Sequence, residues 1–137
     1  MEKVFVDTNI ILDWLGNRAP FFKYAKELFL KGERAEIELL VSTISFVNTQ
    51  YILRKQIGKE KAKQTLAAIR TICTICSSGE KEIDLALVSS FTDLEDAFQY
   101  YSALNNAAKV IITRNPKDFT HSEIPIMSAE EYLKSLE

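Results

Sequence analysis

The chain contains little glycine, proline, cysteine and histidine, residues that are abundant in several special classes of protein. Its 137 residues include 4 Gly, 3 Pro, 2 Cys and 1 His. So little glycine and proline excludes collagen-like and low-complexity chains, and a hydrophobic content of 47% argues against intrinsic disorder. Because no linker interrupts the sequence, we expect one domain over residues 1–137.

The sequence also lacks long hydrophobic runs and an excess of positive charge. Residues 4–15 form an apolar stretch, but Asp7 and Asp13 interrupt it, and a membrane span needs about 20 apolar residues. We therefore expect a soluble, cytoplasmic protein without membrane contact. The net charge of −2 argues against binding nucleic acid through bulk positive charge. Residues 1–67 hold 11 basic and 8 acidic residues, whereas residues 68–137 hold 6 and 11.

Two cysteines stand in a C-x-x-C spacing, which is typical of a redox pair or half of a zinc site. Cys73 and Cys76 lie in a β-branched run that reads as a strand, where residues three apart point to opposite faces. A zinc site would need two more ligands, and His121 is the only histidine. The spacing therefore favours two structural cysteines.

Strand and helix patterns alternate along the chain. Strands are predicted at residues 3–6, 37–41, 72–76, 109–113 and 124–127. Helices are predicted at about 10–15, 20–30, 42–56, 59–70, 83–88 and 92–108, followed by a last helix whose Ser128 begins a capping box. This alternation indicates an α/β fold with a mostly parallel sheet.

Two helices have further expected features. In the helix after Ser42, the pattern predicts four residues facing the core: Ile44, Val47, Tyr51 and Ile52. The helix over 92–108 is predicted to begin with a capping box formed by Thr92 and Glu95. Its expected apolar stripe consists of Leu94, Ala97, Phe98, Tyr101, Leu104 and Ala108.

Polar side chains follow several of the predicted strands. Asp7 follows the first strand, Asn48 lies in the helix after the second, and Asp96 lies in the first turns of the 92–108 helix. Asn115 and Asp118 follow the strand at 109–113. Because ligands of parallel sheets bind beyond the carboxyl ends of the strands, these oxygens are candidates for binding a hard cation such as Mg²⁺ or Mn²⁺ beside phosphate.

Each of these residues also has a purely structural interpretation. Asp7 can cap the helix that follows it, and Asp93 and Asp96 can be first-turn acids that interact with the helix dipole. Asn48 shares a helix face with apolar residues, so it is either a buried structural amide or a site residue. Asp118 can be a simple turn residue.

Four segments, at residues 4–13, 42–48, 94–101 and 111–119, resemble the PIN-domain family in their order and spacing. The opening Asp-Thr-Asn and the closing Ile-Thr-Arg-Asn-x-x-Asp-Phe carry most of this resemblance, which spans almost the whole chain. It implies a three-layer α/β/α sandwich and a Mg²⁺- or Mn²⁺-dependent ribonuclease, as in VapC-type toxins of toxin–antitoxin pairs. RNA and an antitoxin protein are the implied partners, and a homodimer is an open option.

The resemblance also assigns roles to residues. Asp7 matches the first metal ligand, and Asp96 matches the third acid of the family. Thr8 and Asn9 match the residues that shape the first loop, and Thr113 matches the hydroxyl of the last motif, so these three are expected near the substrate.

The chain departs from the family pattern at two positions. Asn48 stands where the family usually has Glu, and Asn115 stands where it often has Asp. Asp118 or Asp93 is the candidate for the remaining acid. The expected catalytic set is therefore Asp7, Asp96, Asp118 and Asn48, the expected metal ligands are Asp7, Asp96, Asp93 and Asp118, and the expected substrate contacts are Thr8, Asn9, Thr113 and Asn115.

Three hypotheses for function follow. The first is a metal-dependent endoribonuclease, in which Arg54, Lys55, Lys59, Lys61 and Lys63 either guide the RNA backbone or form a solvated helix face. The second, motivated by Asn48, is a PIN-like module that binds RNA or protein without catalysis. The third uses Asp7 as a nucleophile toward phosphate, but the companion acid two residues later is absent because position 9 is Asn.

Overall fold

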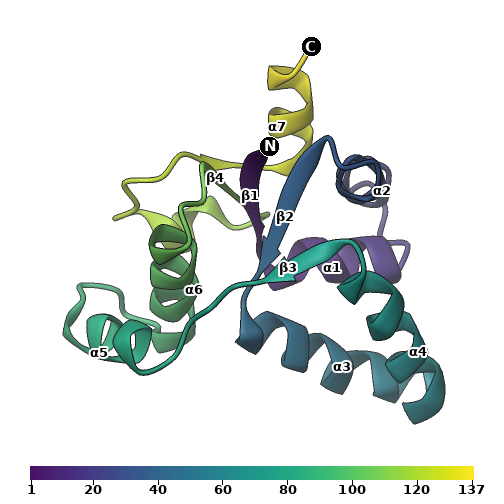
Figure 1. The fold of residues 1–137 in the computed structure, drawn as a ribbon, viewed down its shortest axis with the longest axis horizontal. Helices are drawn as coiled ribbons and strands as arrows, with labels where there is room; N and C mark the ends of the chain where they lie inside the picture. Colours follow the sequence, from purple (N-terminus) through teal and green to yellow (C-terminus); the bar gives the residue numbers. More distant parts are fainter.

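The computed structural model describes residues 1–137. Its centre is a five-stranded, all-parallel sheet with the strand order β3-β2-β1-β4-β5 (Figure 1). The strands are β1 (Glu2–Val6), β2 (Ile37–Val41), β3 (Cys73–Ile75), β4 (Val110–Ile112) and β5 (Ile126–Met127). Strand β1 is central, since Val4 aligns with Leu39 of β2 on one side and with Val110 of β4 on the other. The predicted parallel α/β fold is confirmed.

Helices connect consecutive strands on both faces of the sheet. They are α1 (Thr8–Leu15), α2 (Phe22–Glu33), α3 (Thr43–Ile57), α4 (Lys59–Arg70), α5 (Glu80–Val88), α6 (Leu94–Asn105) and α7 (Ala129–Ser135), with a short 3₁₀ helix η1 (Pro116–Phe119) after β4. Ser128 caps α7 in a capping box with Glu131, as the sequence predicts. No helix is both long and apolar enough to span a membrane.

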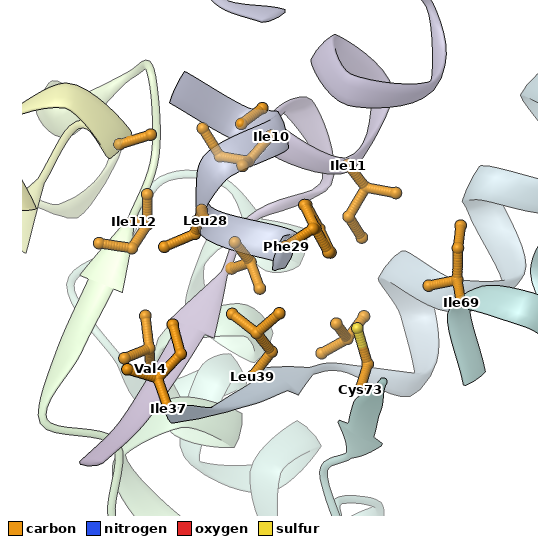
Figure 2. Packing of buried hydrophobic residues seen from close by; sticks show 14 of the residues in the cluster. Val4, Ile10, Ile11, Leu28, Phe29, Ile37, Leu39, Ile69, Cys73 and Ile112 are labelled. Atoms are coloured by element: carbon orange, nitrogen blue, oxygen red, sulfur yellow. The ribbon is translucent and has the colours of Figure 1, made fainter. Parts of the chain in front are cut away.

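The two faces of the sheet bury separate hydrophobic clusters. On one face, Val4, Leu39 and Ile112 pack against Ile10 of α1 and Phe29 of α2 (Figure 2). This cluster extends to α3, α4 and α7. On the other face, a smaller cluster joins the sheet to α6, and α5 packs on the outside of α6 (Figure 1). The result is the expected three-layer α/β/α arrangement.

The two cysteines lie on opposite sides of the sheet. Cys73 belongs to the larger cluster and Cys76 to the smaller one, and both are buried and free. Burial raises the pKa of each thiol to about 12, so neither is a reactive thiolate near neutral pH. Their expected structural role is consistent with this placement.

The expected inward face of α3 is wrong in part. Val47 and Tyr51 are 65% and 51% exposed. The buried face instead consists of Ser45, Thr49 and Leu53, which recur at the i, i+4 spacing of one helix face. Apolar residues lie all around α3, so their positions alone do not identify the side that packs on the sheet.

Two expectations for α6 also need correction. The helix begins at Leu94 and its cap is Asp93, whose side chain accepts a 3.0 Å hydrogen bond from the backbone N–H of Asp96, so Thr92 is not the cap. Leu94 and Leu104 are exposed, and Ala108 lies beyond the helix end. The buried face includes polar residues that an apolar pattern does not reveal: Gln99 and Ser102.

Candidate metal and RNA site

Two neighbouring strands deliver polar residues to the same edge of the sheet. Strand β1 ends at Val6 and is followed by Asp7, whose backbone N–H donates to the carbonyl of Ile112 at 3.0 Å. Thr113 follows at the end of β4. Asp7 has an extended backbone and caps α1, as its structural interpretation predicts. The capping role does not remove it from the site, because only part of its carboxylate is used by the helix.

Four donors surround the Asp7 carboxylate. Its Oδ1 accepts from the backbone N–H of Thr8 at 2.8 Å and from Nε2 of Gln99 at 3.2 Å. Its Oδ2 accepts from the hydroxyl of Thr113 at 2.9 Å and from Nδ2 of Asn9 at 3.4 Å. We call Thr8, Asn9, Gln99 and Thr113 the Asp7 cradle. Since its donors come from three chain segments, the cradle fixes the carboxylate from several directions.

Ser45 extends the Asp7 cradle into α3. Its hydroxyl is buried, lies 2.6 Å from the hydroxyl of Thr8 and accepts from Nε2 of Gln99 at 2.7 Å. Ser42, the N-cap of α3, accepts from the backbone N–H of Ser45 at 3.0 Å and so holds this first turn in place. The first loop, α3 and α6 therefore meet in one hydrogen-bond network.

An ion pair between Arg114 and the buried carboxylate of Asp13 secures the loop after β4. Nε of Arg114 lies 2.7 Å from Oδ2 of Asp13, whose side chain is 0% exposed. The backbone N–H of Arg114 also donates to Oδ1 of Asn9 at 3.3 Å. Burial raises the pKa of Asp13, and the nearby Arg114 guanidinium opposes that shift. Arg114 thus links the loop that carries Thr113 to α1.

One cavity lies away from the predicted metal ligands. It has a volume of about 380 Å³, is bounded by α1, α2, Arg114 and the start of α7, and is lined in part by Phe21 and Tyr24. None of Asp7, Asp93, Asp96 and Asp118 lines it. Its size alone therefore does not make it the reaction site.

A smaller, polar cavity holds the acidic residues. We call it the acidic pocket; it has a volume of about 170 Å³ and lies between the start of α6 and η1. Three carboxylates line it, from Asp93, Asp96 and Asp118, and Lys117 and His121 lie on its wall. The expected proximity of the α6 and η1 acids is therefore present in the fold.

Asp96 is the residue most affected by this surrounding. Burial and then the charges of Asp118, Asp93, Asp7 and Glu95 raise its pKa to about 7. No cationic side chain contributes to this shift. A carboxyl group with such a pKa is a characteristic of functional sites, because the fold holds like charges together at a cost in stability.

The donor set is suited to a hard divalent cation. Carboxylate, amide and hydroxyl oxygens are the ligands that Mg²⁺ and Mn²⁺ prefer, and a cation would offset the repulsion that raises the pKa of Asp96. No three His, Cys, Asp or Glu side chains are close enough to surround one ion as they stand. Water and substrate phosphate usually complete such sites, so a two-carboxylate set fits the chemistry.

The remaining predicted site residues take less central positions. Asn48 is half-buried on α3 and its side chain makes no hydrogen bond within the chain. The side chain of Asn115 is exposed, and its backbone N–H donates to the hydroxyl of Thr113 at 3.1 Å. Asp118 lies in η1 rather than in an irregular loop.

Sequence reasoning missed Ser45 and Gln99. Both are buried polar residues on helices: Gln99 donates to Asp7 as part of the Asp7 cradle, and Ser45 accepts from Gln99. Gln99 lies three residues after Asp96, a spacing that places two residues on the same side of a helix. This spacing could have indicated that Gln99 lies near Asp96. It is noticed only if polar residues, and not apolar residues alone, are considered for the buried face of the helix.

With this geometry established, comparison with known proteins identifies the family. A profile described as the PIN domain matches residues 3–117. The chain belongs to the PIN-domain family. Within that family it is a homologue of VapC ribonucleases: Ribonuclease VapC1 of Aquifex aeolicus is 32% identical over 136 residues, covering 96% of this chain and 93% of the relative.

Solved structures agree on the fold. VapBC-1 from nontypeable Haemophilus influenzae matches with a TM-score of 0.68 and 17% identity, covering 93% of this chain and 98% of that one. VapBC2 from Rickettsia felis, bound to a DNA fragment from its promoter, matches with a TM-score of 0.65 and 16% identity, covering 92% and 97%. At this level of identity, the likeness shows a common fold.

Proposed function

We propose that this chain is a Mg²⁺- or Mn²⁺-dependent endoribonuclease and the toxin half of a toxin–antitoxin pair. The observation that carries this proposal is the gathering of Asp93, Asp96 and Asp118 around the acidic pocket. Burial, and then the charges of Asp118, Asp93 and Asp7, raise the pKa of Asp96 there, which supports the same conclusion. The homology with Ribonuclease VapC1 supports RNA as the substrate class.

In this proposal Asp7 and Asp96 hold the ion, with Asp118 or Asp93 as a further ligand. A bound Mg²⁺ or Mn²⁺ would polarise a phosphodiester oxygen and lower the pKa of a coordinated water. The Asp7 cradle orients the Asp7 carboxylate by donating to both of its oxygens. Lys117, on the wall of the acidic pocket, supplies a positive charge for an RNA phosphate.

The exposed side of α3 and α4 is the proposed path of the RNA backbone. Arg54 and Lys55 lie over the half-exposed ring of Tyr51, at 5.3 and 4.3 Å from its centroid. An aromatic ring flanked by cations suits single-stranded RNA, since bases stack on the ring and phosphates pair with the charges. Lys59, Lys61 and Lys63 continue the positive charge along α4.

The antitoxin is the proposed protein partner. Homologous folds have been crystallised as VapBC assemblies, one of them on promoter DNA. We therefore expect that a small protein encoded beside this chain binds it and stops RNA cleavage.

A cleavage assay tests the proposed activity. Purified protein is expected to cut single-stranded RNA with Mn²⁺ or Mg²⁺ but not with EDTA, and Asp7→Asn is expected to lower the rate at least about 100-fold, since even outer partners of metal ligands are worth 10–100-fold. Asp84→Asn is the matched control, because Asp84 is an exposed acid on α5 outside the acidic pocket. Equal rates for the parent and Asp7→Asn would contradict the proposal.

Asn48 favours a second candidate, a PIN-like module that binds RNA without cutting it. Its half-buried side chain brings no negative charge to the site. RNA binding that is unchanged by EDTA and by Asp7→Asn, without cleavage, would favour the module. Cleavage that rises in Asn48→Glu would favour the nuclease, because the substitution adds a carboxylate at the position where the family usually has one.

A further inference from the structure

Gln99 is a buried polar residue whose amide is only half satisfied. It is 1% exposed in the middle of α6. Its Nε2 donates to Oδ1 of Asp7 and to the hydroxyl of Ser45, but its Oε1 is buried without a hydrogen-bond partner. An unpaired buried acceptor lowers the stability of the folded state. Packing alone therefore does not explain why a glutamine occupies this buried position.

The orientation of the amide follows from its neighbours. If the amide were turned over, Oε1 would face the Asp7 carboxylate, and two acceptors without a proton between them repel. Nε2 must face Asp7, which leaves Oε1 as the unpaired atom. The unpaired Oε1 of Gln99 is therefore a consequence of the hydrogen bond that its Nε2 donates to Asp7.

We propose that Gln99 is a positioning residue that fixes the Asp7 carboxylate for metal binding, through one amide nitrogen that bridges Asp7 and Ser45. This inference rests on the proposed function. Gln99 and Asp96 lie on neighbouring turns of α6, so the same helix orients one carboxylate and supplies the other. Ser45 holds the bridge from α3 and contacts Thr8, whose N–H donates to the same oxygen of Asp7.

The substitution Gln99→Met separates positioning from packing. Met has a similar length and volume but neither a donor nor an unpaired acceptor. We expect Gln99→Met to unfold at the same temperature as the parent or a higher one, because the buried Oε1 is removed. We expect its Mn²⁺ dissociation constant, measured by titration calorimetry, to rise about 10–100-fold, the usual effect of losing an outer partner of a metal ligand.

Ser102→Ala is the matched control. Ser102 lies on the same helix, is also buried and also has an unpaired side-chain oxygen, but its hydroxyl makes no hydrogen bond to Asp7 or to the Asp7 cradle. We expect it to leave the Mn²⁺ affinity unchanged. Ser45→Ala is expected to weaken Mn²⁺ binding less than Gln99→Met, and the double variant is expected to be no weaker than Gln99→Met alone, because both act through one bridge.

A second measurement does not depend on metal or on RNA. Side-chain coupling constants from NMR report whether Asp7 keeps one χ1 rotamer; we expect one rotamer in the parent and averaging in Gln99→Met. A fixed Asp7 rotamer in Gln99→Met, or an Mn²⁺ dissociation constant within twofold of the parent, would overturn the positioning role. If the parent itself neither binds Mn²⁺ nor cuts RNA, the proposed function fails, and the rotamer measurement still decides whether Gln99 positions Asp7.

Discussion

The two acidic parts of the site, Asp7 within its cradle and the acidic pocket, differ in how their negative charge is balanced. Asp7 receives four hydrogen bonds from Thr8, Asn9, Gln99 and Thr113. In the acidic pocket, the backbone N–H of Asp96 donates to Asp93, but the other influences on the Asp96 carboxyl are burial and nearby negative charges. The fold stabilises one carboxylate by itself and leaves the other without a counterion.

This difference assigns separate tasks to the two parts. Donors on both oxygens fix the direction of the Asp7 carboxylate, so its orientation is set before any ligand arrives. In the proposed function, a cation in the pocket would offset the negative charges that help to raise the pKa of Asp96 to about 7, so Asp96 would favour cation binding.

The largest effect is expected from the Asp7 cradle. Thr113→Val keeps the shape of the side chain but removes the hydroxyl that donates to Asp7 and accepts from the backbone N–H of Asn115. Because Thr113 is fully buried, the free energy of unfolding in urea should fall by about 1–3 kcal/mol. Thr113→Ser retains the hydroxyl and should lose less. Equal losses in both variants would mean that the hydroxyl does not stabilise the cradle.

Removing the Asp96 carboxylate from the acidic pocket is expected to have a smaller effect on stability, and to raise it rather than lower it. The raised pKa of Asp96 means that the folded state holds its proton more tightly than the unfolded state. Between about pH 4 and pH 7, the unfolded state therefore ionises first, and stability falls as the pH rises. Asp96→Asn removes this contribution, so in EDTA its melting temperature should exceed that of the parent.

The higher melting temperature of Asp96→Asn is expected to depend on pH, and this dependence tests the explanation more specifically. The difference in melting temperature should grow from pH 4 to pH 7 and stay constant above, and it should amount to a few degrees at most because Asp96 is partly solvated. Adding Mn²⁺ should raise the melting temperature of the parent more than that of Asp96→Asn. An advantage that is the same at pH 4 and pH 8 would contradict the account.

The smallest expected effect is the difference between the nearby acids in how much each one raises the pKa of Asp96. Asp118 raises the pKa of Asp96 more than Asp93 does, and Glu95 contributes least. In carbon-detected NMR titrations with EDTA, Asp118→Asn should therefore lower this pKa more than Asp93→Asn, and Glu95→Gln should lower it least. Asn also caps helices well, so Asp93→Asn should keep the start of α6. A larger decrease with Asp93→Asn would reverse the order of the two neighbours.

The sequence predicts the sheet and the positions of Asp7 and Thr113 because apolar strands end directly before them. It predicts the helices as well, but not all of their buried faces. Ser45 and Gln99 were missed because a polar residue on a helix is usually solvated, and only the packing of α3 and α6 against the first loop buries them. Tyr51 was placed inward for the converse reason, since an aromatic residue is usually buried.

The sequence also does not show which neighbouring acid has the largest effect on Asp96. The sequence spacing places both Asp93 and Asp118 near the end of the sheet and does not distinguish between them. Only the fold brings Asp118 from η1 to the start of α6, where its charge is the largest electrostatic influence on Asp96. Long-range proximity of this kind depends on how the loop after β4 folds, and Arg114 holds that loop through its ion pair with the buried carboxylate of Asp13.

The central claim is that Asp7 and Asp96 share one divalent cation. Crystals grown with Mn²⁺ and measured at the manganese absorption edge test it directly. The account predicts one anomalous peak with a carboxylate oxygen of Asp7 and one of Asp96 each at about 2.1 Å, the distance typical of small hard cations. A peak bound by Asp93 and Asp118 without Asp7, or no peak at saturating Mn²⁺, would contradict the claim.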